Sequence, residues 1–161
     1  MIKMNDVIDL IQEQDEYASF ILGICLWKSK WLQYSLADKF EWRTLSFKYC
    51  NRREIPRKPG IYSFVINPTV AQHPQRYLCY IGKSDNLQRR YEEYLREAEN
   101  NYGRPKIVRV LKKWEEFMEF SFTLLEKSRL ENVENYLIET FVPYANDQYP
   151  AQVSRVVGAF K

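Results

Sequence analysis

Hydrophobic and polar positions follow two different periods along this chain, and each change of period marks a new predicted element. Three segments carry β-branched and aromatic residues at strand spacing: residues 60–67, 77–82 and 118–125. Three others show helical spacing: from a cap at Ser84 or Asp85 to about Ala98, from Pro105 to Trp114, and over residues 130–141. The order β-β-α-α-β-α predicts an α/β (α+β) domain, with a small central antiparallel sheet flanked by helices.

The chain before this pattern is less regular. Residues 5–27 show helical spacing with an acidic outer face, whereas residues 28–50 are rich in Trp and Tyr, mix both periods and predict no definite element. Residues 51–59 (NRREIPRKP) are basic and broken by proline, which is typical of a connector. We therefore expect a helical and aromatic N-terminal extension over residues 1–58, packed on a domain of residues 59–161.

The composition excludes several classes of protein. Of the 161 residues, 45% are hydrophobic, which is enough for a buried core, and the single histidine, His73, excludes sites that need two histidines. There are three cysteines, Cys25, Cys50 and Cys79, an odd number scattered along the chain, which indicates reduced core residues. No apolar run approaches the roughly 18 residues of a membrane helix, and the N-terminus is acidic where a signal peptide is basic. We therefore expect a cytoplasmic protein without a membrane partner.

Positive charge is concentrated in the middle of the chain, although the net charge is only +3. Residues 76–113 hold ten basic and five acidic residues, which favours a polyanionic partner for one face. The helix predicted from Pro105 carries four basic residues opposite its apolar side: Lys106, Arg109, Lys112 and Lys113. An ordinary solvated helix has the same pattern, so phosphate binding and solvation both stay open.

The last predicted helix places a carboxylate on its apolar face. At about 100° per residue, Glu134 falls within the arc of apolar positions, whereas Glu131 lies at its margin and Glu139 outside it. A carboxylate in such a position is costly unless it is paired or bound to a metal. A metal ligand and an ion pair with Lys or Arg are both open interpretations of Glu134.

The helix after Gly82 shows a similar contrast between neighbours. Arg90 lies at the edge of the apolar face beside Tyr94, four residues on, whereas Arg89 faces away from it. Arg90 and Tyr94 are therefore able to face one site, although simple stacking of the guanidinium on the ring explains the same spacing.

Together these pieces resemble the GIY-YIG nuclease family. Gly60-Ile61-Tyr62 and Tyr80-Ile81-Gly82 match its two tripeptides, and Arg90 matches its arginine. Glu134, in Glu134-Asn135-Tyr136-Leu137-Ile138, matches its metal-binding glutamate, and Asn146 matches a late asparagine. The similarity covers about residues 59–149. Many members carry His where this chain has Tyr94, and the segment Ser63 to Cys79 is long for the family. The stretch from Tyr80 to Arg90 is similar to that of the small phage and restriction-type branch.

The resemblance implies a role for each matched residue in phosphodiester hydrolysis. Glu134 would hold one divalent metal ion, most suitably Mg²⁺, and Arg90 would clamp the scissile phosphate. Tyr62 would orient or deprotonate the attacking water, with Lys83 and Arg90 lowering its pKa. Tyr80 and Tyr94 would position water or phosphate, and Asn146 would organise the site.

The resemblance also implies the substrate class. We expect a restriction-type or phage-type endonuclease that acts on double-stranded DNA, without an organic cofactor, and that forms a homodimer if it cuts both strands together. DNA contacts are expected from the basic residues Lys106, Arg109, Lys112, Lys113, Arg52 and Arg53. A structure-specific repair nuclease and a non-cleaving nucleic-acid-binding module of the same fold are the alternatives.

Overall fold

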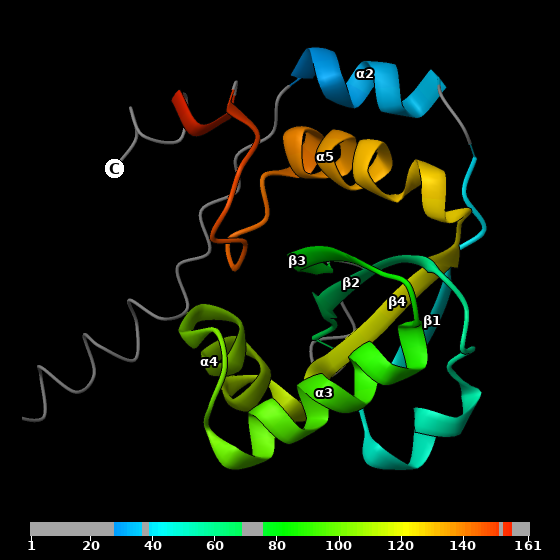
Figure 1. The fold of residues 1–161 in the computed structure, drawn as a ribbon. Helices are drawn as coiled ribbons and strands as arrows, with labels where there is room; N and C mark the ends of the chain where they lie inside the picture. The colour runs from blue at the N-terminus through cyan, green and yellow to red at the C-terminus, as the bar shows by residue number, and fades with distance from the viewer. Residues whose placement is uncertain (1–27, 37–38, 69–75, 152, 156–161) are drawn as a thin grey trace, which may run out of the picture.

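The computed structural model describes residues 28–36, 39–68, 76–151 and 153–155 (Figure 1). The helix predicted over residues 5–27 and His73 lie outside the described residues. The helices are α2 (Lys28–Leu36), α3 (Leu87–Asn100), α4 (Pro105–Lys113) and α5 (Leu130–Phe141). The strands are β1 (Arg43–Ser46), β2 (Gly60–Ile66), β3 (Tyr77–Ser84) and β4 (Met118–Leu124). Three 3₁₀ turns connect them: η1 (Tyr49–Glu54), η3 (Glu115–Phe117) and η4 (Lys127–Arg129).

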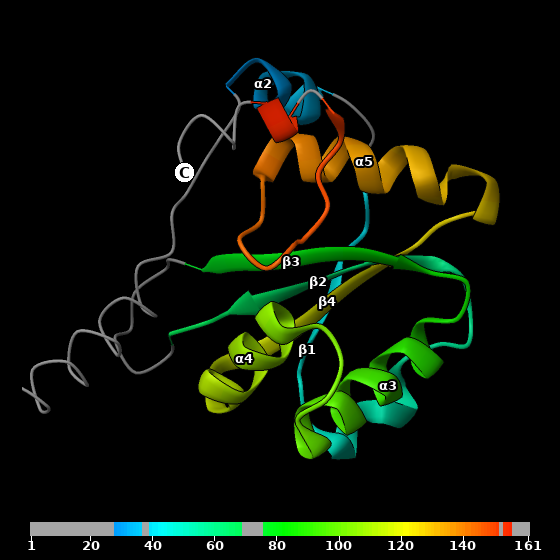
Figure 2. The same ribbon diagram turned by 60° about the vertical axis from the view of Figure 1, so that its left-hand side comes forward.

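The four strands form one antiparallel sheet in the order β1-β4-β2-β3. Helix α5 covers one face of this sheet and α2 packs on the outer side of α5, whereas α3 and α4 cover the other face (Figures 1 and 2). This arrangement confirms the predicted fold class. In this order β2 is an interior strand and β3 is an edge strand. Side chains of β3 belong to the cores on both faces of the sheet.

Side chains alternate between the two faces of the sheet, as expected for strands. On β2, Ile61 packs under α5 with Ile81 and Leu137, whereas Tyr62 and Phe64 belong to the larger core under α3 and α4. The aromatic content of this second core is high, because strand positions facing α3 and α4 are mostly Tyr or Phe. It is therefore a core with several hydroxyl groups.

The six predicted elements are present, and two further elements come from the segment without a prediction. Strand β1 pairs with β4 from Arg43↔Phe122 to Ser46↔Glu119, so part of the expected extension belongs to the sheet. The division at residues 58/59 stays a prediction. The capping prediction for α3 is wrong: Asn86, not Ser84 or Asp85, is the N-cap, and its side chain accepts the Arg89 N–H at 3.0 Å. Ser84 instead closes the preceding turn, since its hydroxyl accepts the Asn86 N–H.

The prediction of buried, reduced cysteines is confirmed for Cys79 and wrong for the burial of Cys50, and Cys25 lies outside the described residues. Cys79 is buried on β3 and Cys50 is exposed within η1, and both are free thiols. Cys50 lies in a 3₁₀ turn that has no buried residue, which explains its exposure. Within the described residues, no helix has the length and apolar character needed to span a bilayer.

Candidate active site

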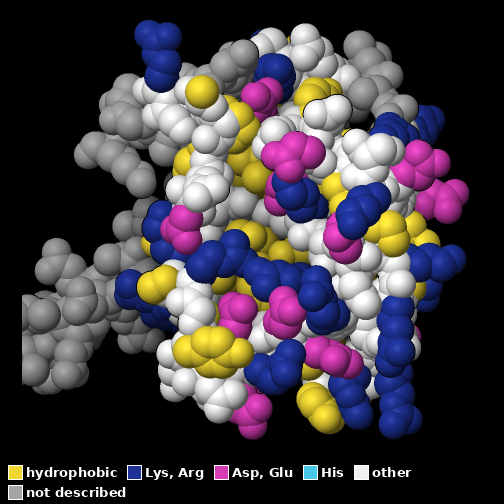
Figure 3. Space-filling view, in the orientation of Figure 1, with side chains coloured by type: hydrophobic (Ala, Val, Ile, Leu, Met, Phe, Trp, Pro, Cys, Tyr) yellow, Lys and Arg dark blue, Asp and Glu magenta, His cyan; other side chains and the backbone are white. Residues whose placement is uncertain are grey.

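Two of the predicted site residues, Lys83 and Arg90, line a cavity at the end of edge strand β3. This cavity has a volume of about 440 Å³, and it is lined from β3, α3, η4 and α5. Its lining residues are Lys83, Ser84, Asp85, Arg89, Arg90, Glu93, Lys127, Leu130 and Glu131. On the face of the molecule shown in Figure 3, Lys and Arg side chains form a band across the middle, between α5 above and α3 and α4 below. The lining is therefore mainly charged, as a site for a charged substrate requires.

Three tyrosines form a buried cluster behind Arg90, which lines this cavity. Tyr62 on β2, Tyr80 on β3 and Tyr94 on α3 are all buried. The hydroxyls of Tyr62 and Tyr94 lie 3.1 Å apart. The structure thus brings together the three tyrosines that the sequence singled out.

Gly82 is the reason that the Tyr62 ring fits over strand β3. The two residues are directly paired across the strands. A Cβ atom on Gly82 would lie 2.5 Å from the Tyr62 hydroxyl oxygen and 2.9 Å from Cε1 of Tyr80. Only glycine leaves space for the ring at this position, which gives the second tripeptide a physical explanation.

Arg90 connects the tyrosine cluster to the cavity. Its Nε donates to the Tyr62 hydroxyl at 3.2 Å and its Nη2 to the Tyr94 hydroxyl at 3.1 Å. Its guanidinium carbon also lies 4.3 Å from the centre of the Tyr94 ring, so both the shared-site and the stacking interpretations hold. The side chain of Arg90 is 24% exposed, against 64% for Arg89. The helical-face prediction is therefore confirmed, although Arg89 lines the same cavity.

The predicted lowering of the Tyr62 pKa is wrong. Burial raises the pKa of Tyr62 above its ordinary value, the neighbouring Tyr80 adds to the rise, and Arg90 and the hydrogen bonds offset only part of it. The charge of Arg90 is itself shared, because its Nη1 donates to Glu93 at 2.8 Å. The phenol is therefore protonated near neutral pH, which makes it a hydrogen-bond donor and a poor base.

Lys83 does not direct its charge to Tyr62 as predicted. It pairs with Ile61 across the strands and so faces α5, on the opposite side of the sheet from Tyr62. Its ammonium lies 2.9 Å from the Glu134 carboxylate and donates to Glu131. Burial lowers the pKa of Lys83, but the two carboxylates outweigh it and the net pKa is raised. Lys83 is therefore a cation and not a base at neutral pH.

Glu134 fits a metal ligand and an ion-pair partner at once. Its side chain is 16% exposed, and Lys83 is its recorded partner among the described residues, through one carboxylate oxygen. Within those residues, no three His, Cys, Asp or Glu side chains group as a metal cluster. A hard divalent cation is commonly held by one or two carboxylates with water and phosphate oxygens completing its shell. The residues present fit Mg²⁺ in this manner, with Glu134 as the protein ligand and Glu131 beside it.

Glu139 lies outside the apolar arc of α5, as the spacing predicts, but helix α2 covers this side of α5 too. Its side chain is 15% exposed, as little as that of Glu134. Helix α2 packs against this part of α5, and Lys30 of α2 forms an ion pair with Glu139 at 3.0 Å. The two carboxylates are thus equally buried and each pairs with a lysine, but only the partner of Glu134, Lys83, lines the cavity.

Asn146 holds the outer edge of β3. Its amide exchanges two hydrogen bonds with the backbone of Ile81: the Ile81 N–H donates at 3.0 Å, and the Asn146 amide donates to the Ile81 carbonyl at 2.8 Å. The neighbouring Ala145 N–H donates to the Cys79 carbonyl. Asn146 is buried, and these bonds replace a missing strand along the second tripeptide. Its expected role in organising the site stays a prediction that this geometry suits.

Arg104 completes the cluster, and sequence reasoning missed it. It is the N-cap residue of α4, and its Nη1 donates to the Tyr80 hydroxyl at 2.6 Å while its Nη2 donates to the Tyr94 hydroxyl. Its only signal in the sequence is a basic residue directly before Pro105 at a helix start. No residue spacing links it to the tyrosines.

The expected DNA-contacting residues lie on α4 and in η1, and none of them lines this cavity. On α4, Arg109, Lys112 and Lys113 are exposed, and Lys106 lies 3.3 Å from Asp147. In η1, Arg53 is exposed and Arg52 lies 3.9 Å over the Tyr49 ring. Their contact with DNA stays a prediction.

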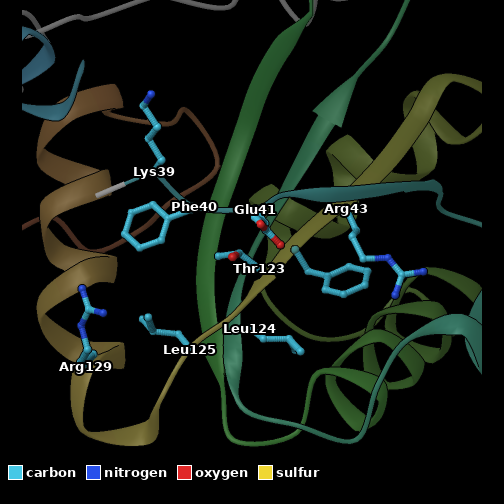
Figure 4. Close-up of a pocket in the computed structure, with 9 residues that line it drawn as sticks. Lys39, Phe40, Glu41, Arg43, Thr123, Leu124, Leu125 and Arg129 are labelled. Atoms are coloured by element: carbon cyan, nitrogen blue, oxygen red, sulfur yellow. The ribbon is translucent and has the colours of Figure 1, made fainter. Parts of the chain in front are cut away.

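A second cavity of about 440 Å³ lies at the opposite edge of the sheet, beside β1 and β4 (Figure 4). Its lining includes Phe40, Glu41, Arg43, Leu125 and Arg129, and none of the predicted catalytic residues. We therefore assign the candidate chemistry to the cavity at β3.

Comparison with known proteins yields solved structures alone. No family model and no curated protein matches this chain. The chain is similar to the GIY-YIG N-terminal endonuclease domain of UvrC from Thermotoga maritima bound to its catalytic magnesium, with 24% identity, a TM-score of 0.44, and coverage of 62% of this chain and 98% of that chain. An asparagine-to-alanine mutant of the same domain, bound to its catalytic divalent cation, gives 23% identity, a TM-score of 0.44, and coverage of 63% and 99%.

Proposed function

We propose that this protein is a metal-dependent endonuclease that hydrolyses phosphodiester bonds in DNA. The observation that carries this proposal is the cavity at β3, where Arg90 approaches from α3 while Lys83, paired with Glu134, approaches from the side of α5. Each group suits one part of a phosphodiester. Arginine donates in a planar fork to phosphate oxygens, and a carboxylate holds a divalent cation beside them.

The residues divide the work as follows. Arg90 binds the scissile phosphate and stabilises the charge that develops on it. Glu134 would hold Mg²⁺, which would supply positive charge at the phosphate and favour ionisation of water. Tyr62 donates its phenol proton in a hydrogen bond instead of taking a proton from water, because burial raises its pKa. Tyr80 and Tyr94 position the groups that reach the cavity.

The basic residues outside the cavity give the substrate its orientation. Contacts from α4 and η1 to phosphates would hold double-stranded DNA across the face in Figure 3, without reading its sequence. The stretch from Tyr80 to Arg90 favours a restriction-type or phage-type enzyme, and a single site per chain requires a homodimer to cut both strands together. A DNA substrate agrees with the cytoplasmic location expected from the sequence.

Cleavage of supercoiled plasmid tests the proposal. The protein is incubated with plasmid in Mg²⁺ and, as the control, in excess chelator, and the new DNA ends are mapped. We expect cleavage in Mg²⁺ only, with ends at fixed sequences. Ends at random positions would argue against a restriction-type enzyme, and cuts confined to branched DNA would indicate a structure-specific repair nuclease. DNA binding without cleavage in any divalent cation would refute the catalytic proposal and leave a binding module.

A further inference from the structure

Arg104 is a second guanidinium at the tyrosine cluster, and none of the roles above uses it. It reaches the cluster from the start of α4, whereas Arg90 reaches it from α3. Its guanidinium carbon lies 5.0 Å from the centre of the Tyr80 ring and 5.7 Å from that of Tyr94, in addition to its hydrogen bonds to both hydroxyls. The guanidinium of Arg104 therefore donates N–H groups to the hydroxyls of Tyr80 and Tyr94 and also lies near their rings.

The partners of Arg104 differ from those of Arg90. Arg90 has a carboxylate on Glu93 at 2.8 Å and another on Glu97 at 3.8 Å. For Arg104, the partners recorded within the described residues are phenols alone. The N–H groups of Arg104 are thus directed at hydroxyl oxygens, which must act as acceptors toward it.

These contacts fix the direction of the hydrogen bonds in the cluster. The Tyr94 oxygen accepts from both Arg90 and Arg104, which uses its two lone pairs. Its own O–H must therefore donate, and the Tyr62 oxygen lies 3.1 Å away. Tyr62 then accepts from Tyr94 and from Arg90, so its O–H must donate as well. Within the described residues, no acceptor for that proton is recorded.

We infer that Arg104 is a positioning residue that acts through Tyr94 to fix Tyr62 as a hydrogen-bond donor to the substrate phosphodiester. This inference rests on the proposed nuclease function. Without Arg104, a lone pair of Tyr94 is free, and the Tyr62 proton has an internal acceptor in place of the substrate. Arg104 itself does not touch the substrate in this arrangement.

A double-mutant cycle tests the inference. The variants are Arg104→Met, Tyr94→Phe and the double variant, with Arg96→Met as the matched control, since Arg96 is an exposed arginine on α3. Single-turnover cleavage is measured in Mg²⁺, and DNA affinity in Ca²⁺. We expect Arg104→Met to slow cleavage by about 10- to 100-fold, the usual effect of losing a residue that orients another. Its DNA affinity should match that of Arg96→Met.

The double variant separates a role through Tyr94 from a direct one. We expect it to cleave no more slowly than Tyr94→Phe, because residues that act as a unit are not additive. The inference would be overturned if Arg104→Met slowed cleavage by the same factor in the wild type and in Tyr94→Phe. It would also be overturned if Arg104→Met weakened DNA binding as much as it slowed cleavage. Should the methionine variant not fold, Arg104→Lys replaces it, because lysine keeps the charge but lacks the planar fork that reaches two oxygens. If the wild-type protein did not cleave DNA at all, the proposed function itself would be refuted. If the wild type cleaved but Arg104→Met behaved like Arg96→Met, only the inference on Arg104 would be refuted.

Discussion

Gly82→Ala is a small change with a large expected effect. The new Cβ would lie 2.5 Å from the Tyr62 hydroxyl oxygen, whereas ordinary contacts begin at 3.4 Å, so atoms must separate by about 0.9 Å. The Tyr62 ring has little room to move, because it stacks on Phe120 with ring centres 5.3 Å apart and an angle of 18°. Overpacking of this kind typically costs about 1–3 kcal/mol in the free energy of unfolding.

The same displacement breaks the contact between Tyr62 and Arg90, which is 3.2 Å long in the native structure. A misplacement of about 1 Å near the chemistry is able to cost roughly a hundredfold in rate. We therefore expect Gly82→Ala to lose both stability in urea unfolding and single-turnover cleavage. Ile66→Val is the control, since Ile66 is buried at the far end of β2 and its truncation typically costs about 0.5–1.5 kcal/mol. A Gly82→Ala protein with wild-type stability and wild-type cleavage would refute the account of why glycine stands here.

Three further predictions follow from the site. Arg90→Ala should slow cleavage by at least about a hundredfold, against a much smaller loss for the more exposed Arg89→Ala, because one electrostatic stabiliser is worth about 3 kcal/mol; equal losses would contradict this assignment. Tyr62→Phe should slow cleavage and leave DNA affinity nearly unchanged. Since the pKa of Tyr62 is raised, the wild-type cleavage rate should show no phenolate-dependent rise between about pH 6 and 10. A rise in the wild type that disappears in Tyr62→Phe would restore Tyr62 as the base. Asn146→Ala should cost about 1–3 kcal/mol in the free energy of unfolding, because the Ile81 N–H and carbonyl lose their partners in a buried place; an unchanged urea midpoint would show that they find others.

Much of the fold follows from local patterns. Strands β2, β3 and β4 carry their periodicity over seven or eight residues each, with one face packed under α5 and the other under α3 and α4. Strand β1 has four residues, of which only Leu45 is partly buried, so it has no alternation to detect. Its pairing depends on contacts from distant parts of the chain, such as the 2.8 Å hydrogen bond between the Thr44 and Ser121 hydroxyls.

The candidate site was predictable to a similar extent. The sequence distinguishes the buried Arg90 from the exposed Arg89, because the face on which each lies depends only on the period of one helix. Arg104 was missed because its position depends on the turn between α3 and α4, where Asn101 and Gly103 adopt positive φ angles of 55° and 103°. The pKa direction of Tyr62 was mispredicted because a list of nearby charges does not include burial, which outweighs the Arg90 charge here.

The most direct test of the central claim compares two carboxylates on one helix. Glu134 and Glu139 have nearly equal exposure, 16% and 15%, and each forms an ion pair with a lysine, but only the lysine of Glu134 lines the cavity. We measure single-turnover DNA cleavage at increasing Mg²⁺ for Glu134→Gln and Glu139→Gln, with DNA affinity in Ca²⁺ as the check on binding. The account predicts that Glu134→Gln binds DNA but does not cleave it, while Glu139→Gln cleaves at close to the wild-type rate. Cleavage by Glu134→Gln at ordinary Mg²⁺, at the rate of Glu139→Gln, would contradict it.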